Sequence, residues 1–285
     1  MGDYTRWQIG DVRITKIPET MLHWPWKALV PGVTPELLAA TPWMSPHFVD
    51  DDGKLVLSVH ALVVESQGRT IIVDTCIGND KPRPTRAFNG LATPFLDRLG
   101  EAGFDADAID AVFCTHLHVD HVGWNTRLVD GRWVPTFRNA RHLFARTEYD
   151  HWIATDETEL FGDVMADSVV PIVDAGLADF VDMDHRITDE VWLEPTPGHT
   201  PGHCSVHISS GGQDAVITGD MTHSPIQFAY PLTSAADTDS AQADRTRAAF
   251  VSRYRDTPTL IIGTHFAGPT AGRLVRDGDT IRFDC

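Results

Sequence analysis

The sequence predicts an α/β fold, an αβ/βα four-layer sandwich of two mixed β-sheets flanked by helices. Apolar runs of strand length recur along the 285 residues, and segments with helical patterning separate them. Three of these runs are followed two or three residues later by histidine or aspartate. Since a chain of this length can bury one large core and nothing in it demands a split, we expect a single domain over residues 1–285.

Paired strands are expected in the N-terminal third. Residues 5–18 alternate polar and apolar around Gly10-Asp11, and residues 55–66 and 69–75 flank Gln67-Gly68, so each segment predicts a hairpin. Between them, residues 21–50 hold five prolines, which disfavour long regular structure except for a short helix at 35–40. We interpret this segment as a flap that covers the functional site or joins a homodimer interface. The alternative is that its aromatics fill the edge of the core.

The remaining elements follow from periodicity and helix-end signals. Helices are expected at 94–103, from Thr147 with Glu148 in the first turn, at 160–176, and at 240–256 with Ser240 as the cap and its arginines toward solvent. Strands are expected at 111–114, 141–145, 186–194, 203–209, 215–217 and 260–262, and a C-terminal hairpin around Asp277-Gly278.

Residues 115–123, THLHVDHVG, carry the strongest chemical signal. They follow the apolar run 111–114 and supply His116, His118, Asp120 and His121. Side chains two apart project the same way from an extended backbone, so the first two histidines can converge on one point. The spacing indicates two adjacent metal sites, with imidazoles for a borderline cation such as zinc and a carboxylate for the second ion.

Three further candidate ligands stand beside later apolar runs or in a turn. His199 lies in TPGHTPGH, Asp220 follows the run 215–217, and His265 follows the run 260–262. The order of these motifs resembles that of the metallo-β-lactamase-fold hydrolases over nearly the whole chain. The resemblance implies that His116, His118 and His199 bind one ion, that Asp120, His121 and His265 bind the other, and that Asp220 lies between both.

The resemblance also implies a mechanism. Two divalent ions, zinc first with iron, manganese or cobalt as substitutes, would hold a bridging water and lower its pKa to give hydroxide. Asp120 and Asp220 are the expected catalytic residues, and Asp120 could also pass a proton to the leaving group. Asp74 resembles the family's turn near the metals and is expected to orient the histidines.

A neutral ester-like bond, most simply a lactone, is the expected target. The acidic chain disfavours nucleases, and true β-lactamases usually lack an aspartate at the position of Asp220, so lactonases and methyl-parathion-hydrolase-like enzymes fit best. Aryl esters or phosphotriesters are expected as side activities. Trp26 and Phe48 of the flap, with His223 and Phe228 beyond Asp220, are the expected substrate contacts. The alternatives are a glyoxalase II-like thioesterase, a mononuclear iron persulfide dioxygenase of the same fold, or a non-catalytic metal-binding protein.

Composition restricts partners and compartment. A formal net charge of −17 disfavours nucleic acid as a partner, and the longest apolar runs are too short to span a membrane. The four cysteines form no C-x-x-C pair, and the N-terminus lacks the pattern of a signal peptide. We therefore expect a cytoplasmic protein without disulfides that acts on a small molecule. His60, His142 and His151 are expected to be structural.

Overall fold

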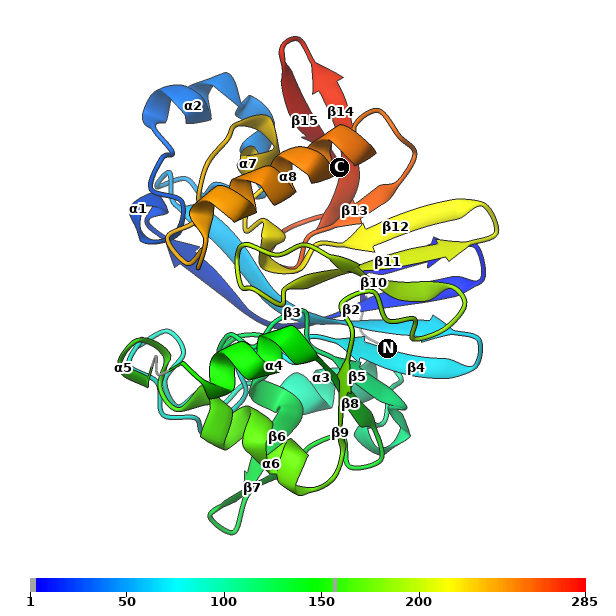
Figure 1. Ribbon diagram of the computed structural model, residues 1–285. Coiled ribbons are helices and arrows are strands. Elements are labelled where there is room, and N and C mark those ends of the chain that lie inside the picture. Colours follow the sequence, from blue (N-terminus) through cyan, green and yellow to red (C-terminus); the bar gives the residue numbers. More distant parts are fainter. Residues whose placement is uncertain (1–3, 156–157) are drawn as a thin grey trace.

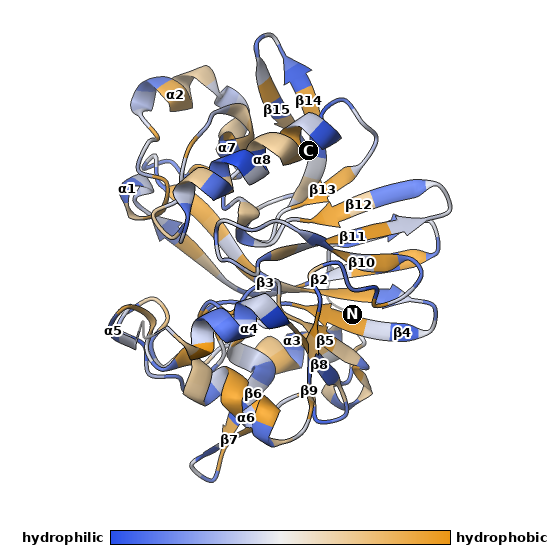
Figure 2. Cartoon of the chain, in the orientation of Figure 1, coloured by the Kyte–Doolittle hydropathy of each residue, from blue (hydrophilic) through white to orange (hydrophobic). Residues whose placement is uncertain are grey.

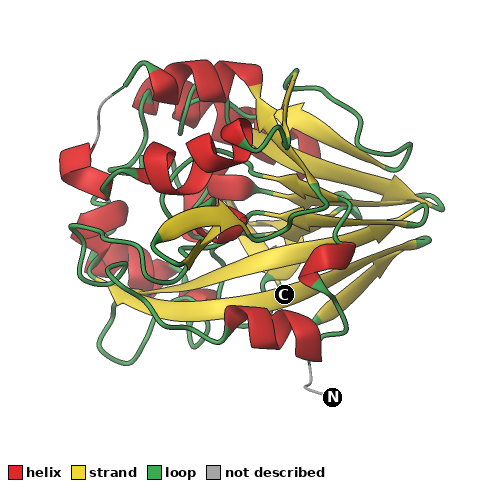
Figure 3. Cartoon of the chain, turned by 90° about the horizontal axis from the view of Figure 1, so that it is seen from below, coloured by secondary structure: helices red, strands yellow, loops and turns green. Residues whose placement is uncertain are grey.

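The computed structural model describes residues 4–155 and 158–285. Over that part of the chain, two mixed β-sheets pack against each other and helices lie on their outer sides (Figure 1). Seen from below, the strands form the inner layers and most helices lie outside them (Figure 3). The predicted αβ/βα arrangement is confirmed.

The first sheet combines an antiparallel half with a parallel half. Within the described residues its strand order is β1-β2-β3-β4-β5-β8-β9, and β4, β5, β8 and β9 run parallel. Its strands are β1 (Arg6–Ile9), β2 (Val12–Trp24), β3 (Leu55–Ser66), β4 (Arg69–Val73), β5 (Ala111–Phe113), β8 (Arg141–Ala145) and β9 (Ala178–Val181). The parallel half brings the carboxyl ends of β4, β5 and β8 to one edge.

The second sheet has the order β10-β11-β12-β13-β14-β15 among the described residues, with a parallel pair at β12 and β13. Its strands are β10 (Val191–Pro195), β11 (Cys204–Ser210), β12 (Gln213–Ile217), β13 (Leu260–Ile262), β14 (Ala271–Asp277) and β15 (Thr280–Asp284). A separate hairpin joins β6 (Thr126–Val129) to β7 (Arg132–Pro135).

Most helices are short. They are α1 (Trp26–Leu29), α2 (Pro35–Ala40), α3 (Phe95–Glu101), α4 (Arg146–Ile153), α5 (Thr158–Phe161), α6 (Val170–Asp174), α7 (Ile226–Ala229) and α8 (Ser240–Tyr254). A π-helical turn, η4 (Met165–Val169), precedes α6, and 3-10 turns occur at η1 (Pro42–Met44), η2 (Ala106–Ala108), η3 (Gly123–Asn125) and η5 (Gly219–Met221).

The core has two compartments because strand side chains alternate between faces. Leu62 and Val64 of β3 belong to the apolar layer between the sheets, together with Val206 and Ile208 of β11. Val63, between them, instead joins the layer beneath the helices. Hydrophobic residues accordingly concentrate along the strands, whereas α4 and α8 carry hydrophilic residues as well (Figure 2).

Several expected elements differ in detail. The helix expected at 160–176 is broken into α5, η4 and α6, because Gly162 adopts a φ of +78° and Pro171 cannot continue the hydrogen-bond ladder. Asp239, not Ser240, caps α8, since its side chain accepts a hydrogen bond from the backbone N–H of Gln242 at 2.9 Å. Arg247 of the same helix is buried rather than solvent-facing.

The segment expected to be an irregular flap is more regular than its prolines indicate. β2 continues to Trp24 by pairing with β3 as far as Leu55, and α1 follows. The short helix at 35–40 is present as α2, with Thr34 accepting a hydrogen bond from the backbone N–H of Leu37. The strand expected at 186–194 begins only at Val191, while β9 and the β6–β7 hairpin were not predicted.

In the part of the chain that the structure describes, no helix is both long enough and apolar enough to span a bilayer.

Candidate metal centre

The candidate ligands meet where strands of both sheets end. His116, His118, Asp120 and His121 follow β5, and His199 lies in the turn between β10 and β11. Asp220 lies in η5 after β12, and His265 follows β13. Because β12 and β13 are parallel neighbours, their carboxyl ends deliver Asp220 and His265 to the same edge.

A first cluster consists of His116, His118 and His199. The Nε2 atom of His199 lies 3.2 Å from Nε2 of His116 and 2.9 Å from Nδ1 of His118, and those two atoms are 2.9 Å apart. Nitrogens held about 2.0–2.1 Å from one zinc ion in tetrahedral geometry would be separated by about 3.3 Å. The three imidazoles therefore converge as a zinc-type ligand set does.

A second cluster consists of Asp120, His121 and His265. Their closest approaches are 3.3 Å between the Nε2 atoms of the two histidines, 3.6 Å from His121 Nε2 to Asp120 Oδ1, and 3.5 Å from His265 Nε2 to Asp120 Oδ2. Both histidines are buried, and the Asp120 side chain is 15% exposed. This cluster offers two imidazoles and a carboxylate around one point.

Asp220 lies between the two clusters. Its Oδ2 is 3.8 Å from His116 Nε2 and 3.7 Å from His199 Nε2 on one side, and 3.2 Å from His121 Nε2 on the other. Its Oδ1 is 3.1 Å from His265 Nε2, yet this buried oxygen accepts no hydrogen bond among the described residues. A buried carboxylate oxygen without a donor is costly, and a shared cation would satisfy it.

The outward nitrogens of four histidines have fixed partners. Nδ1 of His116 is 3.1 Å from Thr115 Oγ1, and Nδ1 of His265 is 3.2 Å from the carbonyl oxygen of Ser58. Nδ1 of His121 is 3.0 Å from Asp74 Oδ2. Since such contacts orient the ring and fix its tautomer, the nitrogens that face the clusters are preset as lone-pair donors.

The fourth partner, Asp237, was not anticipated from the sequence. Its Oδ1 is 3.3 Å from His199 Nδ1, and its Oδ2 accepts hydrogen bonds of 2.8 Å from Arg247 Nη2 and from the backbone N–H of Ser234. Despite burial, the contacts with His199 and Arg247 lower the pKa of Asp237, so it stays ionised. This aspartate lies 38 positions after the histidine it holds, and no local pattern marks it.

Electrostatics act in opposite directions on the histidines of the two clusters. Burial lowers the pKa of His116 and His118, and lowers that of His199 to about 4, so these imidazoles are neutral at pH 7. Although burial alone would lower it, the carboxylates of Asp220 and Asp74 raise the pKa of His121. Conversely, burial would raise the pKa of Asp220, but His121, His265 and His223 lower it.

Glu148 of α4 connects the two loops that form the first cluster. Its buried carboxylate accepts hydrogen bonds from the backbone N–H of Leu117 at 3.0 Å and of Gly202 at 2.9 Å, and from Trp152 Nε1 at 2.6 Å. Burial raises the pKa of Glu148. The sequence marked Glu148 only as an acidic residue in a helical first turn, because its partners lie far along the chain.

His203 packs against the first cluster without being one of its ligands. It is fully buried, and its ring centroid is 5.2 Å from that of His116. A Cβ atom on Gly219 would lie 2.4 Å from His203 Nε2, and Gly219 has a φ of +55°, so glycine is required for η5 to approach this ring. This close approach brings Asp220 to its place between the clusters.

The pocket above the centre has apolar walls. Besides His118, Asp120, Asp220 and His265, it is lined by Leu22, Trp24, Leu29, Leu57, Phe88, Val119, Phe161, His223 and Ala236. His223, an expected substrate contact, is among these lining residues, and its Nε2 lies 3.1 Å from Asp220 Oδ2.

The other three expected substrate contacts are corrected by the structure. Trp26, Phe48 and Phe228 do not line this pocket. Trp26 is buried and donates from Nε1 to the carbonyl oxygen of Gly53 at 3.0 Å. Phe48 and Phe228 pack in an aromatic group with Phe266 and Phe283. Within the flap, Leu22, Trp24 and Leu29 face the pocket instead.

Comparison with known proteins identifies the family. A model of the metallo-beta-lactamase superfamily matches residues 55–265. The N-acyl homoserine lactonase AiiA of Bacillus thuringiensis subsp. kurstaki is 25% identical over 190 residues, covering 62% of this chain and 69% of its own. AttM of Agrobacterium fabrum, also an N-acyl homoserine lactonase, is 31% identical over 117 residues, covering 39% of this chain and 40% of its own.

Solved structures show the same fold. AidC, described as a dizinc quorum-quenching lactonase, superposes with a TM-score of 0.79 at 21% identity, covering 98% of this chain and 96% of its own. The hydrolase AbOPH superposes with a TM-score of 0.81 at 22% identity, covering 100% and 97%. The chain therefore belongs to the metallo-β-lactamase superfamily, as an enzyme of its metal-dependent hydrolase type.

Proposed function

We propose that this chain is a dinuclear metal-dependent lactonase. The observation that carries the proposal is Asp220, which lies between two ligand clusters at the floor of an apolar pocket. The curated relatives named above are N-acyl homoserine lactonases, which supports an ester-like bond in a lactone as the target.

The residues fit two divalent ions, with zinc as the first choice because the donors are mainly imidazoles, and with iron, manganese or cobalt as substitutes. We assign His116, His118 and His199 to one ion, Asp120, His121 and His265 to the other, and Asp220 to both. When bound, the ions would polarise the carbonyl oxygen and supply a nucleophilic water at neutral pH.

The chain's own groups would position the substrate and move the proton. Leu22, Trp24, Leu57 and Phe88 would bury the apolar part of the substrate and exclude bulk water. The Asp120 carboxylate faces the pocket and is partly exposed, so it can accept the proton that the attacking water gives up and pass it to the leaving alkoxide. The apolar walls and a net charge of −17 disfavour polyanionic substrates.

The test combines metal content with a substrate panel. Elemental analysis of the purified protein should give two transition-metal ions per chain, and lactones should be cleaved in preference to aryl esters, phosphotriesters and β-lactams. One iron with no second metal would support a persulfide dioxygenase instead, and preference for thioesters would support a glyoxalase II-like activity. Efficient cleavage of β-lactams or phosphodiesters without lactone hydrolysis would refute the assigned substrate.

Replacing Asp220 by alanine tests the shared ligand. The variant should stay folded yet lose most activity and part of the metal, because two neighbouring cations repel each other without a carboxylate between them. Asp214→Ala is a matched control, since Asp214 lies at the opposite end of β12 with its side chain 40% exposed. Wild-type turnover in Asp220→Ala would contradict the assignment.

A further inference from the structure

Lys16 of β2 is a buried cation without an acidic partner. It lies opposite Leu62 in the pairing of β2 with β3, and Leu62 belongs to the apolar layer between the two sheets. Its Nζ donates a hydrogen bond to Thr270 Oγ1 at 2.6 Å, and no carboxylate among the described residues pairs with it. Burial lowers the pKa of Lys16 to about 8, so the side chain is still mostly charged at pH 7. Such a group is costly, and costly groups are expected where function requires them.

Thr270 closes the loop that carries His265. This loop runs from the end of β13 to the start of β14, over residues 263–270. The carbonyl oxygen of Thr270 accepts a hydrogen bond from the backbone N–H of Gly263 at 3.0 Å, and Thr270 Oγ1 donates to the carbonyl oxygen of Phe266 at 2.9 Å. Thr270 adopts a φ of +66°, which is unfavourable for a β-branched residue. The contacts of its side chain, including the one from Lys16, hold it in this conformation.

The loop of the second sheet is thus attached to the first sheet through two neighbouring strands. Ser58 of β3 donates from its backbone N–H to the carbonyl oxygen of His265 at 3.0 Å, and its own carbonyl oxygen lies 3.2 Å from His265 Nδ1. Those contacts hold the ligand itself, whereas Lys16 of β2 holds the end of the loop. Removing the Lys16 side chain would remove the hydrogen bond that ties Thr270 to the first sheet.

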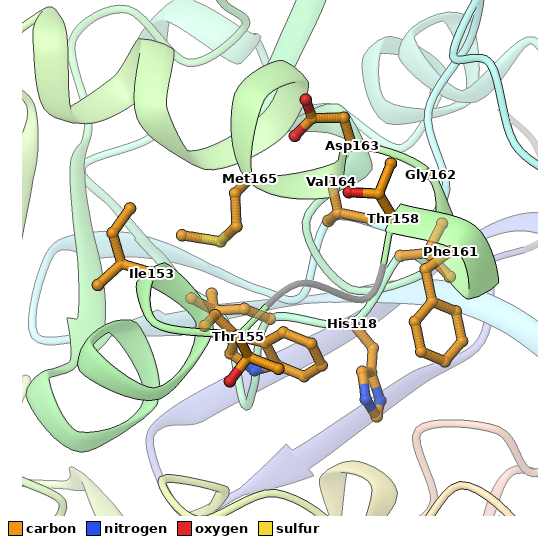
Figure 4. A pocket seen from close by; sticks show the side chains of 12 residues that line it. His118, Ile153, Thr155, Thr158, Phe161, Gly162, Asp163, Val164 and Met165 are labelled. Atoms are coloured by element: carbon orange, nitrogen blue, oxygen red, sulfur yellow. The ribbon is translucent and has the colours of Figure 1, made fainter.

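The first cluster has different supports. His118 borders a cavity lined by α4, α5 and η4, and Figure 4 shows its ring beside that of Phe161, with centroids 5.3 Å apart. His199 is held by Asp237. None of these contacts involves Lys16, so we expect a change at Lys16 to act on the second cluster.

We propose that Lys16 is a positioning residue of the second metal cluster, because it fixes through Thr270 the loop that presents His265. The inference rests on the two-ion site of the proposed function, since it assigns a role in holding one of the two ions. It also accounts for a cation buried between the sheets. Replacing Lys16 by an apolar residue should stabilise the fold and weaken binding of the second ion at the same time. A residue with only a structural role would not separate these two effects.

Amide hydrogen exchange of the metal-free protein tests the loop directly. In Lys16→Met, the backbone amides of Gly263 and Thr270 should exchange about tenfold faster than in the wild type, because a hydrogen bond from a charged group is lost. Thr15→Val is the matched control. Thr15 lies next to Lys16 on the opposite face of β2, and its buried Oγ1 has no hydrogen-bond partner among the described residues. This change should therefore stabilise the fold without altering the loop.

Zinc titration against a chromophoric chelator tests the metal site. Lys16→Met should weaken binding of the second ion about tenfold and leave the first ion unchanged. His265→Ala identifies the second ion, because it removes one of its ligands. Thr270→Ala should weaken the same ion, and Thr270→Ser, which keeps the hydroxyl, should bind it as the wild type does. The double variant Lys16→Met/Thr270→Ala should lose no more affinity than the weaker-binding single variant, because both changes break one contact.

The outcomes separate this proposal from the proposed function. If the protein binds two ions, a Lys16→Met variant that matches the wild type or Thr15→Val in loop exchange or in second-ion affinity would overturn the role of Lys16 and leave the two-ion assignment standing. A wild-type protein that binds one ion would refute the dinuclear function. Faster exchange of the loop amides in metal-free Lys16→Met would then still support the anchoring of the His265 loop by Lys16, and unchanged exchange would overturn it.

Discussion

The contact between Asp237 and His199 offers a test of how the chain prepares its first cluster. Asp237→Asn keeps the shape of the side chain but removes the charge next to His199 Nδ1. Replacement of a residue that orients a metal ligand typically weakens metal binding about 10-fold to 100-fold, which corresponds to about 1.4–2.7 kcal/mol. We expect a loss in this range, confined to the ion held by His116, His118 and His199.

The variant should still fold. Arg247 loses one carboxylate partner but keeps Asp244, whose Oδ1 is 2.9 Å from Arg247 Nη2. Loss of one hydrogen bond to a charged group costs about 1.5–3 kcal/mol, so a modest fall in the free energy of unfolding is expected. The sign of the pH effect follows from the lowered pKa of Asp237. Its stabilising contribution is present at neutral pH and is lost as pH falls below the ordinary aspartate range, so Asp237→Asn should remove part of the acid sensitivity.

The assay is metal transfer from the zinc-loaded protein to a chromophoric chelator. One of the two release phases should shift in Asp237→Asn, and neither should shift in the control Asp239→Asn. Asp239 caps α8 through Gln242 only, and asparagine is an equally good cap. Equal shifts in both phases, or no shift in either, would show that Asp237 does not act through His199.

Three further outcomes are expected. Burial lowers the pKa of Lys16 to about 8, so between about pH 8 and 10.4 the unfolded chain binds one more proton than the folded chain. Lys16→Met should therefore raise the free energy of unfolding of the metal-free protein by up to ~3 kcal/mol at pH 7. This gain, measured by urea titration, should shrink toward pH 10. Asp167→Asn should lower the free energy of unfolding by about 3–5 kcal/mol, because it leaves the buried Lys81 and Arg83 side chains without their carboxylate partner. An unchanged urea midpoint would contradict this. Trp24→Ala should raise KM for aryl esters about tenfold at constant kcat, because Trp24 packs on Phe88 in the pocket wall, and a fall in kcat alone would argue against a binding role.

The sequence was informative where local pattern and chemistry coincide. Each metal-site residue follows a short apolar strand or lies in a proline-glycine turn, so its placement near the sheet edges could be predicted. Trp26 and Phe48 were misassigned because an aromatic side chain in a proline-rich segment has the same pattern whether it faces a cavity or the core. The β6–β7 hairpin had a usable signal, since Asp130-Gly131 is a favoured two-residue turn.

Long-range carboxylates could not be predicted in the same way. Glu19 accepts hydrogen bonds from the backbone N–H groups of Ile77 and Gly78 and from Trp124 Nε1, which fixes the turn after β4 next to Asp74. These partners are 58 to 105 positions away along the chain. The residue types are ordinary, and only the fold brings them together.

Helix α4 supports the metal centre through two of its side chains, and this decides which substitutions leave the ligands undisturbed. Its Glu148 holds the backbone of both loops of the first cluster, while its Trp152 both donates to Glu148 and packs against His118. A substitution at Trp152 would therefore disturb the Glu148 carboxylate and the packing of the His118 ring together, so a loss of metal in such a variant could not be assigned to either contact alone.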